Sequence, residues 1–132
     1  MSKRRESDII TSFVLRPVDG GAVISHRPGQ YLTFRFDIPG LPPQHRNYSI
    51  SSAPNAESYR ISVKRETHGL VSRFLHDQVE EGAVIEVAPP TGDFHLPTGQ
   101  ERPVVLLSGG VGLTPMVSML ETIANDGRDV PV

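Results

Sequence analysis

The sequence has no cysteine, no excess of positive charge and no long apolar run, and each absence excludes a class of protein. Without cysteine, the chain holds neither a disulfide nor a cysteine-ligated zinc or iron–sulfur centre. A net charge of -2 gives no basic patch for nucleic acid, which requires clustered Lys and Arg. No window is apolar over the roughly 20 residues of a membrane-spanning helix, and residues 1–5 lack the apolar stretch of a secretory signal. We therefore expect a cytoplasmic protein that binds neither nucleic acid nor membrane.

The first hundred residues have the pattern of an antiparallel sheet or barrel. Runs rich in Val, Ile, Thr, Phe and Tyr, separated by Gly and Pro, occur at 9–18, 30–38, 46–52, 59–66 and 84–89. Alternation is clear in the fourth run, where Ile61 and Val63 alternate with Arg60, Ser62 and Lys64. Each strand is therefore expected to have one buried side and one solvent-facing side. The charged residues 4–8 are interpreted as a solvated lead-in to the first strand.

Apolar spacing also predicts two helices. Residues 70–79 carry Leu and Val at helical intervals until Gly82 ends the pattern. After residue 100 the sequence pattern changes. An apolar run at 103–107 leads through glycines at 109–112 into a second helical pattern. Residues 129–132 are interpreted as the approach to another strand.

The length of 132 residues accommodates one domain with a proper core and not two of ordinary size. We therefore divide the chain into a barrel at 1–100 and, at 101–132, the first strand, turn and helix of an α/β nucleotide-binding domain that the sequence does not complete. Apolar surface is then expected on Val105, Leu107, Met116 and Leu120, which leads us to expect self-association or disorder there.

The first candidate motif is Arg46, Asn47, Tyr48 and Ser49, at the start of a predicted strand. Alternation places Arg46 and Tyr48 on one face. A guanidinium that grips a diphosphate beside a ring that stacks on a flat heterocycle suits a nucleotide or flavin. The alternative is a strand whose Tyr48 packs into the core and whose Arg46 is solvated.

The second motif, Gly69, Leu70, Val71 and Ser72, lies where a strand gives way to a helix. Free backbone N–H groups and the positive end of the helix dipole favour an anion there, and Gly69 lets a ligand approach the backbone. An ordinary helix start, with Ser72 as a capping or first-turn residue, is the alternative.

The third motif is a glycine turn between the 103–107 run and the second helix. Pro115 suits the first turn of that helix, and the glycines allow a dinucleotide to approach the main chain. The spacing is not the G-x-G-x-x-G fingerprint, so the turn is weak support by itself. Its residues are Gly109, Gly110, Val111, Gly112, Leu113 and Thr114.

Together, in this order, the three motifs resemble the ferredoxin-NADP reductase superfamily. Within it the chain is most similar to the reductase part of bacterial flavohemoglobins, through the 27–32, 46–49, 61–66, 69–72 and 90–94 segments. The resemblance implies a six-stranded antiparallel Greek-key flavin-binding barrel with one short helix, FAD and NAD(P)H as cofactors, and a haem globin or an iron–sulfur ferredoxin-like domain as electron acceptor.

The resemblance also implies the roles of individual residues. Arg46 and Asn47 would contact FAD, as would residues 69–72 at its pyrophosphate and Tyr31, Val63 and Lys64 beside it. Tyr48, Ser49 and Thr114 would lie at the reacting end, and residues 109–114 would admit nicotinamide. The cofactors supply the chemistry, so no side chain need act as a general acid or base.

The resemblance implies a flavin-dependent oxidoreductase module that passes a hydride from NAD(P)H to FAD and then electrons to a haem or iron–sulfur partner. Two other functions stay open. A barrel that holds FAD without activity is the alternative, because the nucleotide-binding part is incomplete, and a barrel without any cofactor is a third. The five histidines fit no metal-ligand spacing, and Ser108 lacks the G-x-S-x-G elbow of a hydrolase, so we expect neither a metal site nor nucleophilic catalysis.

Overall fold

Six short antiparallel strands form two three-stranded sheets in the computed structural model, which describes residues 1–97 and 103–127. One sheet has the order β1-β2-β5, with β1 at Ser2–Arg5, β2 at Ile10–Leu15 and β5 at Tyr59–Lys64. The other has the order β4-β3-β6, with β4 at Gln44–Ser49, β3 at Tyr31–Phe36 and β6 at Glu86–Val87. An isolated bridge joins the two sheets: Ile50, the residue after β4, pairs with Ile61 of β5. The expected six-stranded antiparallel arrangement is confirmed, although no continuous ladder closes the barrel within the described residues.

The period of two in the sequence decides which side chains enter the core. In β3, Leu32, Phe34 and Phe36 are buried while the residues between them remain partly exposed. The rings of Phe34 and Phe36 stack with centroids 5.6 Å apart. At about 1.5–3 kcal/mol for each fully buried large apolar side chain, this cluster is the main source of stability in the barrel.

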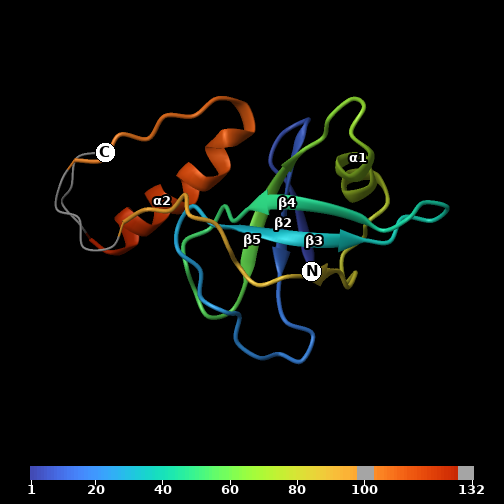
Figure 1. Cartoon of the computed structure of the whole chain (residues 1–132), viewed down its shortest axis with the longest axis horizontal. Coiled ribbons are helices and arrows are strands. Elements are labelled where there is room, and N and C mark those ends of the chain that lie inside the picture. Colours follow the sequence, from blue (N-terminus) through green and yellow to red (C-terminus); the bar gives the residue numbers. More distant parts are fainter. Residues whose placement is uncertain (98–102, 128–132) are drawn as a thin grey trace.

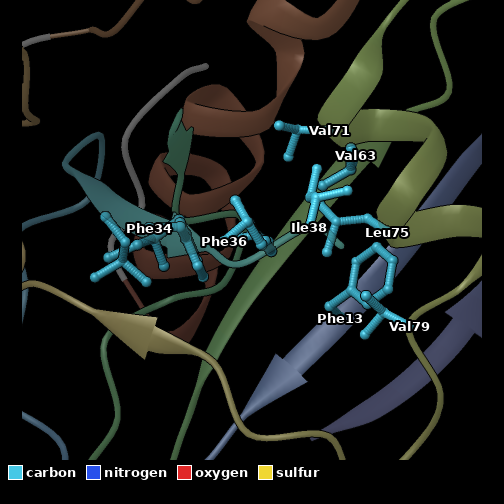
Figure 2. Packing of buried hydrophobic residues seen from close by; sticks show 11 residues of the cluster. Phe13, Phe34, Phe36, Ile38, Val63, Val71, Leu75 and Val79 are labelled. Carbon is cyan, nitrogen blue, oxygen red and sulfur yellow. The ribbon is translucent and has the colours of Figure 1, made fainter. Parts of the chain in front are cut away.

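Helix α1, Leu70–Asp77, covers one end of this core, as the periodicity predicts. Its Val71 and Leu75 are buried in the same cluster as Phe13 and Val63. Figure 2 shows Leu75 beside Phe13, next to Val79, at one side of the cluster. Figure 1 shows α1 and α2, Leu113–Asn125, on opposite sides of the strands, with β3 and β4 running between the two sides.

The interpretation of residues 4–8 as a solvated lead-in was wrong for Arg4 and Arg5. Ser2–Arg5 forms β1, which pairs antiparallel with β2 in the register Ser2 to Val14 and Arg5 to Thr11. Charged side chains are common on edge strands, where one face and one edge meet water, so composition alone hid this strand. Lys3 contributes to the packing, because its Nζ donates to the carbonyls of His76 and Val79 and lies over the Phe13 ring.

Past residue 102, the predicted turn and helix are confirmed and the predicted strand is not. A 3-10 turn at Gly110–Gly112 leads into α2. Residues 103–107 form no strand, because a strand needs a ladder partner and they pair with none of the described residues. Val105 and Leu107 are 77% and 81% exposed, while Val104 and Leu106 contact a second cluster of Leu96, Met119 and Ile123. Alternate side chains of this run therefore contact the second cluster, but its backbone pairs with no strand among the described residues.

The remaining expectations about this part of the chain stay predictions. Residues 129–132, interpreted as the approach to a strand, lie outside the described residues. Exposed Val105, Leu107 and Leu120 agree with the predicted apolar surface, whereas Met116 is partly buried on the second cluster. Self-association and a cytoplasmic location are untested. No helix in residues 1–97 and 103–127 is long and apolar enough to cross a membrane.

Gly29 lies where the loop before β3 meets α2, and we expect Gly29→Ala to be strongly destabilising. Its φ of +109° disfavours any L side chain, and a Cβ there would lie 2.5 Å from the Phe94 carbonyl oxygen and 2.6 Å from Met119 Cε. Strain and overlap together should lower the free energy of unfolding by about 3 kcal/mol, measured by urea denaturation. Gly20→Ala is the control, because φ is +73° there but a Cβ meets open space. Equal losses in the two variants would contradict the overlap.

His26 is the buried titratable group of the barrel and is only 4% exposed. Its Nε2 lies 3.1 Å from the Ser52 carbonyl oxygen, so Nε2 carries the proton, and Nδ1 has no partner among the described residues. Its ring meets Tyr59 edge to face at 5.9 Å. Burial lowers the pKa of His26, and the hydrogen bond to Ser52 only partly opposes that shift. The imidazole is therefore held neutral.

This lowered pKa predicts a pH dependence of stability. Below about pH 6.5 the unfolded chain binds a proton at His26 that the folded chain does not, so the free energy of unfolding should fall as the pH drops toward the folded-state pKa. His26→Gln keeps a donor for Ser52 without the titration and should flatten that part of the curve. Urea denaturation at about pH 7.5 and about pH 5.5 measures both. An equal pH dependence in variant and wild type would rule out His26 as its source.

Candidate functional site

All three sequence motifs contribute to one cleft of about 620 Å³, which is a usual size for a small-molecule or cofactor site. Its walls come from β4, from β5 with the loop after it, from the start of α1, and from the turn into α2. These segments are far apart in the sequence, and the strand pairing brings them together. The cleft lies along the join between the two sheets, because β4 and β5 are the strands linked by the Ile50–Ile61 bridge.

The β4 wall consists of Arg46, Asn47, Tyr48 and Ser49. The Tyr48 ring is held by edge-to-face contacts with Phe34 at 5.7 Å and with a second core ring at 6.5 Å. Burial raises the pKa of Tyr48, and the nearby Arg46 charge opposes that shift, so the phenol is neutral in the physiological range. Arg46 is exposed, with Nη1 donating to the His45 carbonyl at 2.6 Å. This wall therefore offers a fixed aromatic ring beside a solvent-facing cation.

The β5 wall adds Ser62, Val63 and Lys64. Val63 has its side chain in the core, whereas Ser62 and Lys64 are partly exposed on the opposite face. Ser62 Oγ lies 2.9 Å from the hydroxyls of both Ser12 and Ser51. Lys64 Nζ forms an ion pair with Glu66 at 2.9 Å. A polar floor with one tethered ammonium group results.

The start of α1 forms the third wall, with Gly69, Leu70, Val71 and Ser72. Ser72 Oγ accepts from the backbone N–H of Glu66 at 3.1 Å and donates to the Gly69 carbonyl at 3.3 Å. No side chain of the described residues caps this helix start, so its first-turn N–H groups are available to an anion. A Cβ on Gly69 would overlap with Ser72 Oγ, so glycine is required for this close packing.

The fourth wall is the turn into α2, with Val111, Gly112, Thr114 and Pro115. Thr114 Oγ1 donates to the Val111 carbonyl at 2.9 Å, which ties the threonine back to the turn. Pro115 is buried in the first turn of α2, the position that suits proline. The structure thus brings the third motif against the same cleft as the first two.

Most of the predicted site residues line the cleft, and the others lie close by. Tyr31 is on β3, where its ring contacts Gly92. Gly110 and Leu113 line an adjoining hollow that shares Ser62, Lys64 and Thr114 with the cleft. Gly109 precedes the 3-10 turn, and a Cβ there would meet open space.

Sequence reasoning did not assign three residues that the structure places in the cleft: Ser62, Glu66 and Pro115. The alternation in β5 was a usable signal for Ser62, because it shares a face with Lys64. Glu66 precedes the Gly69 helix start, and only the folded loop shows that it lines the cleft. Among the described residues, no group of three or more His, Asp or Glu side chains is placed to hold a metal ion.

For the first two motifs, the alternative interpretations as an ordinary strand and an ordinary helix start are each partly correct. Tyr48 packs against the core and Arg46 is solvated, as expected of an ordinary strand, yet both line the cleft. Ser72 behaves as a first-turn residue through its bond to the Gly69 carbonyl and lines the cleft as well. These positions therefore combine ordinary strand or helix packing with a place in the lining of the cleft.

Comparison with known proteins gives consistent matches. The family model for the oxidoreductase FAD-binding domain matches residues 1–96. A flavohemoprotein of Xylella fastidiosa (strain 9a5c) is 61% identical over 133 residues, covering 100% of this chain and 34% of that protein. The chain therefore spans about a third of the length of this curated relative.

Two solved structures resemble the fold closely. The flavohem-like FAD/NAD binding domain of nitric oxide dioxygenase from Vibrio cholerae O1 biovar El Tor has a TM-score of 0.92 at 46% identity, with 97% of this chain and 56% of that chain covered. Phthalate dioxygenase reductase, described as passing electrons from pyridine nucleotides to [2Fe-2S], has a TM-score of 0.84 at 30% identity, with 96% and 39% covered.

Proposed function

The chain belongs to the oxidoreductase FAD-binding domain family, and we propose that it is the FAD-holding part of an enzyme that passes a hydride from NADH or NADPH to FAD and then electrons to a haem partner. The observation that carries this proposal is the convergence of three separate motifs on one cleft. Each wall of the cleft offers a group that suits one part of a flavin dinucleotide.

The residues that line the cleft have the chemistry that FAD requires. An aromatic ring with fixed orientation, Tyr48, suits the flat isoalloxazine. The Arg46 guanidinium and the uncapped N–H groups at the start of α1 suit a pyrophosphate, because both favour negative charge. Gly69 has no Cβ, which leaves the room that Ser72 Oγ takes beside that backbone. These groups fit FAD, and we assign them to hold it.

The other walls are assigned to the reacting end of the cofactor. Ser49 follows Tyr48 on β4 and offers a hydroxyl next to the stacking ring. Val63, Lys64 and Asn47 complete the flavin contacts, with Tyr31 nearby. Thr114 faces the cleft from α2, where the hydride donor would enter along residues 109–114. FAD itself supplies the redox chemistry when bound, accepting two electrons with a hydride and releasing them singly.

We further propose the division of the chain into a flavin domain at 1–100 and the opening of a pyridine-nucleotide domain at 101–132. The barrel core draws all its buried residues from the first part, whereas Met119 and Ile123 of the second part pack on Leu96 in a separate cluster, which supports two parts that meet at this contact. Because the chain covers 34% of its flavohemoprotein relative, the activity belongs to the whole protein.

Haem is favoured as the electron acceptor because the relative at 61% identity is a flavohemoprotein. An iron–sulfur acceptor is the second candidate, supported by phthalate dioxygenase reductase at 30% identity. An inactive FAD-binding barrel is not favoured, because the matched relatives are oxidoreductases.

The test is the visible absorbance spectrum of the purified chain after incubation with FAD and desalting. We expect a retained flavin spectrum, because every wall of the cleft lies within the described residues. Anaerobic NADH is then added to that chain and to the full-length protein, and flavin bleaching is expected in the full-length protein. Loss of all flavin from both proteins on desalting would overturn the proposal.

Arg46→Met should weaken FAD binding by about tenfold, because it removes the cation assigned to the pyrophosphate and keeps an unbranched side chain of similar length. Titration of FAD fluorescence measures the Kd. Arg73→Met is the matched control, since Arg73 is exposed on α1 outside the cleft and should leave the Kd unchanged. Equal effects of the two variants would show that net charge, and not the cleft, determines affinity.

A further inference from the structure

Helix α2 is fastened to the barrel by polar contacts that lie outside the cleft. Ser118 is fully buried, and its Oγ donates to the Ser52 carbonyl at 2.7 Å. Glu121 uses both carboxylate oxygens: Oε1 accepts from Arg60 Nη2 at 2.6 Å, and Oε2 accepts from the Ala53 N–H at 3.0 Å. Both side chains of α2 therefore bind the short segment 51–53 or the arginine beside it.

Residues of the barrel also form hydrogen bonds with this segment. His26 Nε2 donates to the same Ser52 carbonyl at 3.1 Å, so that oxygen has donors from the barrel and from α2. Arg60 Nη2 also donates to the Ser51 carbonyl, and the Ser51 N–H donates to the Arg60 carbonyl at 2.7 Å. The receiving segment therefore has hydrogen bonds to the barrel in addition to those that it makes with α2.

Helical geometry connects these contacts to the cleft. Ser118 follows Thr114 by four residues and precedes Glu121 by three, so all three lie on one face of α2. Thr114 and the buried Pro115 line the cleft at the beginning of that helix. A rotation of α2 about its axis would move Thr114 away from the cleft together with the other two. The polar contacts of Ser118 and Glu121 therefore define where the fourth wall stands.

The apolar contacts of α2 cannot define that rotation alone. Met119 and Ile123 pack against Leu96, but apolar burial is non-directional and tolerates small rotations and sliding. Hydrogen bonds to a carboxylate are directional and are stronger than those between neutral groups. The side chains of Arg60 and Glu121 are 30% and 36% exposed. Solvent therefore weakens the attraction between the two charges, but the hydrogen bond between them still has a defined direction.

We propose that Glu121 and Ser118 are positioning residues that orient α2 so that Val111, Gly112, Thr114 and Pro115 close one wall of the FAD cleft. This inference rests on the proposed FAD function. Neither residue lines the cleft, so an effect on bound flavin is transmitted through α2 or through the 51–53 segment that both residues contact, and hydrogen exchange in α2 separates the two routes.

The experiment compares wild type with Glu121→Ala in three measurements on the FAD-loaded chain. We expect the Kd for FAD to rise about fivefold, because one wall becomes loose while the other three remain. Iodide quenching of flavin fluorescence should increase, since the flavin becomes more accessible. Hydrogen exchange should accelerate at the amides of α2 and stay unchanged in β2 and β5. Glu121→Gln keeps one acceptor oxygen and should fall between the two.

Glu86→Ala is the matched control. It removes a glutamate that also forms an ion pair with an arginine, Arg35, at 2.7 Å, but it lies on β6, away from α2. Wild-type values of the FAD Kd, of iodide quenching and of α2 exchange are expected there. Glu121→Ala behaving like Glu86→Ala in all three measurements would overturn the proposal.

Two further variants protect the test against misfolding. If Glu121→Ala fails to fold, Arg60→Met and Ser118→Ala each remove one of the proposed contacts and should show smaller changes in the same direction. If wild type retains no FAD, the proposed function fails, and hydrogen exchange on the flavin-free chain still decides whether these contacts hold α2. If the α2 amides of all these variants exchange at the wild-type rate, the positioning role is refuted.

Discussion

The alternation of side chains along β5 is the constraint on which both the core and the cleft depend. Ile61 and Val63 point into the apolar cluster, and their burial fixes the register with β2 through pairs such as Phe13 with Ile61. Because a shift by one residue would exchange the two faces, the same register places Ser62 and Lys64 in the cleft. Core packing and site geometry are therefore consequences of a single strand register.

Much of the fold was predictable from the sequence where the physical signal is local. The period of two located β2 through β5, and the apolar spacing located α1, because burial of one face leaves its mark on neighbouring residues. Strand β1 was missed because Lys3, Arg4 and Arg5 resemble a solvated segment, and only pairing with β2 makes them a strand. The 103–107 run was predicted as a strand because burial and pairing usually coincide, yet here the run has no ladder partner among the described residues.

The cleft was predictable to a similar degree and for a related reason. Motifs with unusual residue types in short succession, such as Arg46 with Tyr48 and Gly69 with Ser72, stand out in a single segment. Contacts between distant segments leave no local pattern, which is why the Ser118 hydroxyl on the Ser52 carbonyl was not anticipated. The alternation in β5 places Ser62 on the same face as Lys64. That this face lines a cleft becomes clear only from the other segments that fold against it.

The place where α2 is fastened explains how a cleft built from both parts of the chain keeps its shape. Tyr48 and Ser49 end β4, and the segment that receives Ser118 and Glu121 begins two residues later at Ser51. Through these contacts, the position of the turn into α2 depends on the same stretch of backbone that carries the Tyr48 ring. A small movement of β4 would move Tyr48 and the turn into α2 together. The distance between these two walls of the cleft is therefore preserved by hydrogen bonds, although the walls lie far apart in the sequence. Fastening α2 to a remote surface of the barrel would lack this property.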